Sequence, residues 1–434
     1  MSQPTLPRRP AALLRNLLLA IATPILLGNA VSAASADKPA PAADAASAAD
    51  AGKTKVRAEL FKILTPAQAQ VSAKQFKEAL ATLKGIDTVK DVTPVELALV
   101  RRMRAVAYVG NGDLELAEAD MQQVIEDPQV SKDDRLQLER MMARTWYGKQ
   151  PPERALQWAK RFLAEGGVDD VMHTIITQTL YKSGDCTATV EAVQAALAAA
   201  ETAGIKPSEG RLQMLAACQQ KLKDLTGQTA TLEKLAVAYP NKDYWNRLIS
   251  LVMRKDTFAE YAVLDGMRLR LAAGSLIDPE EYVDMAQLAY KVGYPEEARR
   301  VLEAGEKAGT LSADKAGVDY VKLRALVETQ SAEDRKLLGQ GDARAESAKN
   351  GVALFSTGYN YVSHQKFDVG LSMMERGIAR GGLPHADLAQ LELGMALVQA
   401  NRPDDARKAL EAVKGADGAA DLAHLWLLSL QKRS

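Results

Sequence analysis

The chain has 434 residues, of which 47% are apolar and 25% are charged, so it can bury a core and is not globally disordered. Basic and acidic residues balance at 55 each, which leaves no net field to hold a polyanion and excludes nucleic acid as the main partner. Two cysteines and four scattered histidines argue against a disulfide-rich scaffold and a metal centre, and we expect no cofactor.

The N-terminus has the features of an export signal. Residues 1–33 contain three arginines and no acid, and their apolar run, 17–27, is 11 residues long. This run is about half as long as a bilayer-spanning helix. The small–x–small sequence at 31–33 (VSA) fits a cleavage site. We therefore expect a cleaved signal peptide and a soluble periplasmic protein of a bacterium; the alternative is an uncleaved membrane anchor.

A linker follows the signal. Residues 34–56 begin with ASADKPAPAADAASAADAGK, which is rich in Ala, Pro, Asp and Ser and has no apolar periodicity. This composition is typical of a flexible tether. No later stretch reaches 18 consecutive apolar residues, so we expect no membrane span after the signal is cleaved.

From residue 57 to residue 433 the sequence repeats one pattern. In its best example a small residue is followed by a large one at +3, a small one at +12, a large one at +16 and proline at +23: Ala105, Tyr108, Ala117, Met121 and Pro128. A glycine–aspartate turn lies in the middle. The spacing predicts two helices whose backbones approach at the small residues, and the proline ends the second helix.

Copies of this pattern recur along the chain, mostly 34–39 residues apart. Their first positions are Ala67, Ala105, Ala143, Thr177, Ala216, Ala286, Gly358 and Gly394. The gaps 216–286 and 286–358 are twice as long, so each predicts a degenerate helix pair, near 243–273 and near 313–349. We therefore expect about ten pairs and a last helix near Ala419–Arg433.

The repeated unit resembles the tetratricopeptide repeat (TPR) family, most closely in GDLELAEADMQQVIEDP and GYPEEARRVLEAG. The resemblance implies an all-α fold, a right-handed α-solenoid of about ten TPR-like helix pairs with a C-terminal capping helix over residues 57–433. The aromatic residue that the family has three positions before the first small residue is mostly absent, since Arg102 precedes Ala105 and Leu391 precedes Gly394. An ordinary helical bundle is the alternative.

The sequence contains no recognisable catalytic constellation. It has no H-E-x-x-H motif and no G-x-S-x-G motif. We therefore expect a non-enzymatic scaffold or adaptor that binds other proteins or peptide segments of the cell envelope. The alternatives are an envelope enzyme that handles polysaccharide or peptidoglycan, and a structural homo-oligomer.

The resemblance also indicates where a partner would bind, because first helices line the concave side of a TPR-like solenoid. Two late units carry an apolar stripe on that side, which predicts a groove for an apolar or amphipathic segment. Its residues are Phe355, Tyr359, Val362, Leu391, Met395 and Val398. The alternative is that the superhelix closes on itself here and buries the stripe.

A second candidate surface is a row of arginines on the early first helices. Arg102, Arg140 and Arg144 project to the concave side in the units 98–128 and 136–163. Such a row could grip an acidic peptide or a C-terminal carboxylate. The alternative, which we favour, is a solvated face whose arginines pair with Glu139 and other nearby acids.

The repeat register also predicts a disulfide between the two cysteines. Cys186 falls in the first turn of a second helix, and Cys218 falls late in the next first helix. Consecutive helices of a TPR stack run antiparallel, so the start of one lies beside the end of the next. An oxidising compartment preserves such a bond. The alternative is two buried free thiols.

Overall fold

The computed structural model describes residues 57–239 and 241–431. These residues form 21 α-helices and two short 3-10 helices and contain no strand, which confirms the all-α expectation. The expected signal peptide (1–33) and linker (34–56) lie outside the described residues. None of the described helices combines the length and the apolar content that a membrane span requires.

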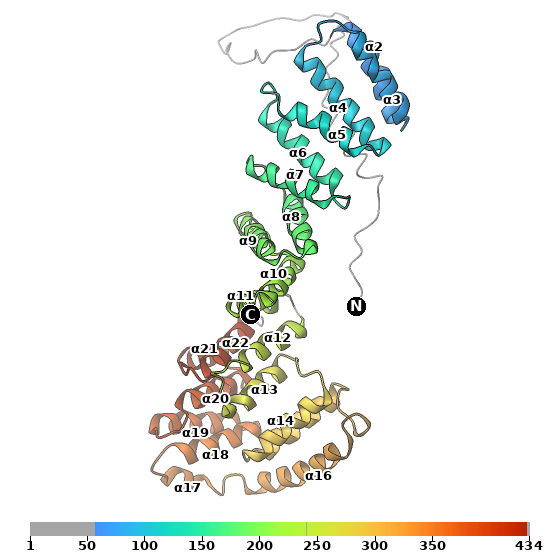
Figure 1. Ribbon diagram of the computed structural model, residues 1–434. Coiled ribbons are helices and arrows are strands. Elements are labelled where there is room, and N and C mark those ends of the chain that lie inside the picture. The colour runs from blue at the N-terminus through green and yellow to red at the C-terminus, as the bar shows by residue number, and fades with distance from the viewer. Residues whose placement is uncertain (1–56, 240, 432–434) are drawn as a thin grey trace, which may run out of the picture. The chain divides into compact units, whose positions relative to one another are not determined.

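The helices form two compact units, one that ends at Ile205 and one that starts at Lys206. Unit 1 contains four helix pairs, coloured blue to green in Figure 1, and the two helices of each pair contact each other. Its helices are α2 (Ala58–Ser72), α3 (Phe76–Leu83), η1 (Lys84–Thr88), α4 (Pro94–Asn111), α5 (Leu114–Ile125), α6 (Lys132–Trp146), α7 (Pro152–Ala164), α8 (Asp170–Ser183) and α9 (Cys186–Thr202).

Unit 2 contains the remaining helices, coloured green to red. They are α10 (Glu209–Lys221), α11 (Leu225–Ala238), α12 (Lys242–Met253), η2 (Glu260–Ala262), α13 (Val263–Ala272), α14 (Pro279–Lys291), α15 (Pro295–Lys307), α16 (Ala313–Leu337), α17 (Asp342–Ser347), α18 (Val352–Ser363), α19 (Phe367–Arg380), α20 (Ala386–Gln399), α21 (Pro403–Glu411) and α22 (Ala419–Gln431). Helix α22 confirms the last helix that the sequence predicts.

The pair α4–α5 shows why the repeated pattern folds as it does. The Oγ1 of Thr93 accepts a hydrogen bond from the backbone N–H of Glu96, and the Glu96 carboxylate accepts one from the backbone N–H of Thr93 at 3.0 Å. This capping box fixes the start of α4. Gly112 ends the helix at φ 97°, a left-handed conformation that favours glycine. Ala105 and Ala117 are both buried between the two helices, as the spacing predicts.

Glycines allow α18 and α19 to approach closely, as Gly358 and Gly370 show. A Cβ atom added to Gly358 would lie 2.6 Å from the backbone oxygen of Gly370. A Cβ atom added to Gly370 would lie 2.7 Å from the backbone oxygen of Gly358. Because neither position has room for a larger residue, the small residues of the pattern are required here by backbone contact.

The two degenerate pairs have different outcomes. Near 243–273 the chain forms α12 and α13, which contact each other as expected. Near 313–349 it forms α16, a helix of 25 residues with a kink at Gly317, and α17, which has only 6 residues. Helix α16 packs on α14 and α15, whereas α17 packs on α18. A helix of fewer than two turns is too short to cover α16, so this repeat is not a regular pair.

Unit 2 closes on itself, because its last helix returns to its early pairs. Helix α22 contacts α11, α12 and α13 as well as α20 and α21, and Figure 1 shows it beside α12. The Nζ of Lys255 lies 2.9 Å from a carboxylate oxygen of Asp421. The hydroxyl of Tyr261 donates to Asp417 at 2.6 Å, and its ring stacks on His385 with centroids 3.7 Å apart. These contacts join segments that are more than 100 residues apart in the sequence.

The predicted disulfide is present. Cys186 is the first residue of α9, and Cys218 lies in the last turn of α10. Both are disulfide-bonded, and since the chain has two cysteines they bond to each other. In the chain-entropy view, the bond stabilises the fold because it restricts the unfolded chain.

Candidate functional site

The predicted apolar groove is absent from unit 2, because its residues are core. Phe355, Tyr359 and Val362 lie on α18, and all three are at most 5% exposed. On α20, Leu391 and Met395 are fully buried and Val398 is half-buried. The expectation of an open groove is therefore wrong, and its alternative, a superhelix that closes on itself, describes unit 2. The physical reason is packing inside unit 2, where α18 contacts α15, α17, α19 and α20, and α20 contacts α18, α19, α21 and α22.

A buried arginine holds the interior of unit 2 together. Arg268 lies on α13, and only 5% of its side chain is exposed. Its guanidinium makes two hydrogen bonds of 2.7 Å to Glu297 on α15 and one each to Asp265, at 2.6 Å, and to Glu392 on α20, at 2.9 Å. The Tyr359 ring of α18 lies 4.6 Å from the guanidinium carbon. We call these five residues the Arg268 cluster; they join four helices from four repeats.

The Arg268 cluster has three carboxylates for one cation, and this imbalance changes their pKa values. Burial, together with the neighbouring Asp265, raises the pKa of Glu392 to about 8. Burial also raises the pKa of Asp265, against the pull of Arg268. The cluster therefore retains a proton near neutral pH. Because its members bond to one another and are enclosed, the cluster stabilises the closure.

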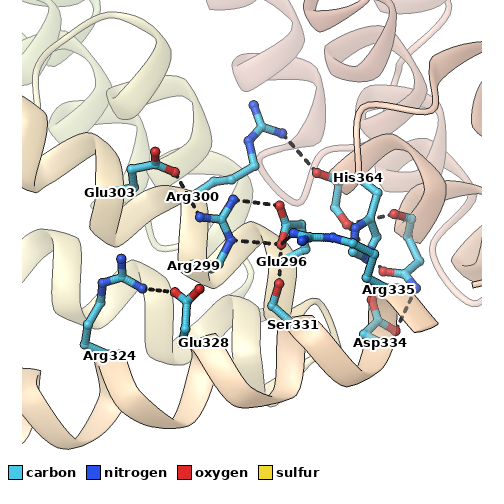
Figure 2. A network of polar contacts seen from close by, with 12 residues as sticks. Glu296, Arg299, Arg300, Glu303, Arg324, Glu328, Ser331, Asp334, Arg335 and His364 are labelled. Carbon is cyan, nitrogen blue, oxygen red and sulfur yellow. Dashed lines mark hydrogen bonds and ion pairs between the residues drawn. The ribbon is translucent and has the colours of Figure 1, made fainter. Parts of the chain in front are cut away.

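A second polar network ties α15 to α16 and α18 (Figure 2). Glu296 of α15 accepts hydrogen bonds from Arg299 at 2.8 Å, from Arg335 at 3.2 Å and from Ser331. Although burial alone would raise its pKa, the bonds from Arg299 and Ser331 lower the pKa of Glu296 to about 2. Figure 2 also shows Asp334 of α16 beside His364, whose Nε2 lies 2.7 Å from the Asp334 carboxylate.

In unit 1 the arginine row lies on first helices, as the sequence predicts, and acids partner it. Arg102 of α4 lies 3.8 Å from Asp134, in the first turn of α6. Arg140 and Arg144 of α6 lie 3.9 Å and 2.9 Å from Asp169, the N-cap of α8. Each pair therefore connects one first helix to the next. This is the alternative that the sequence favoured, in which nearby acids pair with the row, although Glu139 is not one of them.

Glu139, the acid first expected to pair with this row, lies elsewhere. Its side chain is fully buried, and the Nε of Arg161 on α7 lies 2.6 Å from one of its oxygens. Burial and the neighbouring Glu165 carboxylate raise the pKa of Glu139 to about 7. Glu139 thus joins α6 to α7 and leaves the arginine row to Asp134 and Asp169.

The arginine row stays partly open to solvent. The side chains of Arg102, Arg140 and Arg144 are 32%, 45% and 34% exposed. Each guanidinium has five N–H donors. Of the two acids that partner the row, Asp134 accepts no hydrogen bond from it, and Asp169 accepts one, from Nη2 of Arg144. Donors on this row therefore remain for a further acceptor.

Apolar side chains on α8 extend this surface. Val171 and Tyr181 are 41% and 37% exposed. They share one side of α8 with Gln178, by helical spacing, and Gln178 accepts a hydrogen bond from Tyr147, which follows α6. The α4–α6–α8 face, as we define it, consists of Arg102, Arg140, Arg144, Val171 and Tyr181. It combines guanidinium donors with exposed apolar area, a combination typical of protein-binding surfaces.

Within the described residues, no group of three or more His, Cys, Asp and Glu side chains is placed to hold a metal ion. Sequence reasoning missed the Arg268 cluster altogether. Arg268 and Glu392 are 124 positions apart, and no local spacing relates them. The apolar stripe was the one sequence signal of this buried interior, because the apolar side of a helix is more often core than surface.

No protein-family model matches the chain, and no curated protein matches it. Several solved TPR structures do match at low identity. The TPR2AB domain of yeast Sti1, solved as a complex with pHSP90, is 12% identical; the match covers 69% of this chain and 98% of that chain, with a TM-score of 0.23. Yeast Tom70 is 11% identical; the match covers 86% of this chain and 96% of the Tom70 chain, with a TM-score of 0.24.

A bacterial structure gives a similar result. The C-terminal part of a TPR repeat-containing protein from Cytophaga hutchinsonii is 12% identical, with 80% of this chain and 98% of that chain covered and a TM-score of 0.25. Values this low identify no partner and no activity. Through its recurring helix pairs, the chain resembles the tetratricopeptide-repeat proteins.

Proposed function

We propose that this protein is an exported, non-enzymatic scaffold that binds a partner protein of the bacterial envelope through the α4–α6–α8 face. The observation that carries the proposal is the contrast between the two units. On α18 and α20 of unit 2 the predicted apolar stripe is buried, apart from the half-buried Val398. On α4, α6 and α8 of unit 1, in contrast, the five side chains of the α4–α6–α8 face are between 32% and 45% exposed.

The chemistry of the face favours a partner segment with acidic and apolar side chains. Arg140 and Arg144 share a single carboxylate, Asp169, so one guanidinium is in excess at this point. An acidic side chain or a C-terminal carboxylate would accept the remaining N–H donors. Val171 and Tyr181 would cover neighbouring apolar groups of the same segment.

The proposed location rests on the sequence of residues 1–33 and on the disulfide. A positively charged, apolar, small-residue N-terminus is typical of a secretory signal. A disulfide between Cys186 and Cys218 persists in an oxidising compartment such as the periplasm.

Affinity capture of the exported protein from its own periplasm tests this proposal with a charge-matched pair of variants. Arg140→Glu reverses a charge on the face, and Lys160→Glu reverses an exposed charge on α7, a second helix. We expect the Lys160→Glu protein to capture the same partner as the unmodified protein and Arg140→Glu to lose it. Equal capture by all three would contradict the proposed face, and self-association alone, seen by light scattering, would favour a structural homo-oligomer.

A further inference from the structure

A pocket of about 310 Å³ lies in unit 2. Its wall is formed by the C-terminal end of α16, the loop from α16 to α17, one side of α18, and the turn that joins α14 to α15. Four segments that are distant in the sequence therefore converge on one small volume. Neither the repeat pattern nor the proposed function gives this pocket a role.

The polar side of the pocket is anionic. Asp334 and Asp342 line it, and no basic side chain does so among the described residues. Asp334 accepts a hydrogen bond from Asn360 at 3.1 Å. Its other carboxylate oxygen lies 2.7 Å from the Nε2 of His364, and Figure 2 shows the two side chains beside each other. The hydroxyls of Ser356 and Thr357 add neutral donors and acceptors on the same side of α18.

One carboxylate oxygen of Asp342 accepts no hydrogen bond from the described part of the chain. Its Oδ2 accepts a hydrogen bond from the hydroxyl of Tyr361 at 2.8 Å. Its Oδ1 is buried and has no hydrogen-bond partner there. Leaving a buried carboxylate oxygen unpaired is unfavourable, and a rotation of the Asp342 carboxylate that brings Oδ1 to a ligand N–H donor would remove the penalty.

The remaining wall is apolar. Val292 and Leu337 are 56% and 57% exposed, although both are large aliphatic residues. Leu338 completes this side of the pocket. A ligand that fits both sides has an aliphatic stem for the leucine and valine side chains and a cationic head for the two carboxylates.

We propose that this pocket binds an alkylammonium or alkylguanidinium group through Asp334 and Asp342. Two sources carry this chemistry: a lysine or arginine side chain of a partner protein, and a free alkyl cation. The pocket belongs to unit 2 and the proposed partner-binding face to unit 1, so either proposal can fail without the other.

Calorimetric titration of the full exported chain tests the proposal with three probes. Nα-acetyl-arginine methylamide presents the side chain as a protein would, and agmatine presents the same head group as a free cation. Nα-acetyl-citrulline methylamide has nearly the same shape as the arginine probe but no charge. We expect at least one cationic probe to bind with saturation and the citrulline probe to bind at least tenfold more weakly. Binding of the arginine probe indicates a protein side chain, and binding of agmatine alone indicates a free cation.

Two variants connect the binding to this pocket. A Cβ atom at Gly341 meets no atom within 4 Å, and its φ is −88°, so Gly341→Leu adds a side chain at the pocket wall without backbone strain. Asp334→Asn removes one charge and keeps the shape. The control is Asp319→Asn, which removes the same charge from a side chain of α16 that is 87% exposed.

The expected result is loss of cation binding in Gly341→Leu, at least a tenfold weaker affinity in Asp334→Asn, and an unchanged affinity in Asp319→Asn. The proposal is overturned if no cationic probe binds, if the citrulline probe binds as well as the arginine probe, or if Gly341→Leu binds like the unmodified protein. Circular dichroism of each variant confirms that it is folded before its titration is interpreted.

Discussion

Arg268 is a buried cation that joins distant repeats of unit 2. Its side chain is 5% exposed and bonds to carboxylates from three helices, so its removal would leave those charges buried without a cation. Arg268→Ala should therefore cost about 3–5 kcal/mol of unfolding free energy.

Urea unfolding measures this cost, and Arg247→Ala is the matched control because Arg247 is exposed on α12. The control should change the unfolding free energy by no more than about 0.5 kcal/mol. Equal effects of the two substitutions would mean that the Arg268 cluster does not hold unit 2 together.

The pKa of Glu392 gives a prediction with a definite sign. Its pKa in the folded protein, about 8, is higher than the ordinary value of 4.5, so the folded state holds this proton more tightly than the unfolded state does. The stability linked to this proton is fully present below the unfolded pKa and is lost as the pH rises through the folded pKa. Unfolding free energy should therefore fall as the pH rises from about 4.5 to about 8.

Glu392→Gln isolates this contribution, because glutamine imitates the protonated carboxyl. The variant should lose less stability than the unmodified protein over the same pH range, by on the order of 1 kcal/mol. Urea unfolding at several pH values measures the unfolding free energy of the variant and of the unmodified protein. Parallel pH profiles for the two proteins would show that Glu392 does not carry the proton.

At the scale of the helices, the core position of α18 and α20 predicts a large loss of stability on truncation. Phe355 is 5% exposed and Leu391 is fully buried, so Phe355→Ala combined with Leu391→Ala removes two core side chains. Such truncations cost about 3–5 and about 2–5 kcal/mol respectively. Chemical denaturation should therefore show a much lower midpoint.

Leu225→Ala is the control, because Leu225 is 63% exposed on α11. Its effect should stay within about 0.5 kcal/mol. If the double variant were as stable as the control, α18 and α20 would present a surface after all, and the apolar groove predicted from the sequence would be restored.

Spacing alone predicts the regular helix pairs, because their contacts are local. Ala105 and Ala117 are 12 positions apart and meet inside one pair, as do Gly358 and Gly370. The irregular repeat near 313–349 could not be predicted in the same way. There, α17 packs on α18 and not on α16, so its structure depends on the neighbouring repeat.

At the scale of the whole molecule, the candidate sites were only partly predictable. The arginine row was correctly placed on first helices, because its position follows from the repeat register. The burial of the apolar stripe depends on contacts between distant repeats, such as that of Arg268 with Glu392, which are 124 positions apart. Residues so far apart belong to different repeats, and the spacing within one repeat does not relate them. The sequence therefore left the open groove and the closed superhelix as alternatives.

Processing of the chain is a prediction at the same scale. Residues 31–33 (VSA) fit a signal-peptidase site, so the exported protein should begin near Ala34. N-terminal sequencing of material from the periplasmic fraction measures this directly. Retention of the apolar run 17–27 in a membrane fraction would instead indicate an uncleaved anchor.

We propose that unit 1 offers its first helices to a partner, whereas unit 2 keeps its own as core. Hydrogen exchange of the chain with and without the captured partner is the most direct measurement, because it reports which backbone amides a partner protects. We expect new protection in α4, α6 and α8, and unchanged exchange in α18 and α20. New protection confined to α18 and α20, with none in unit 1, would contradict this proposal.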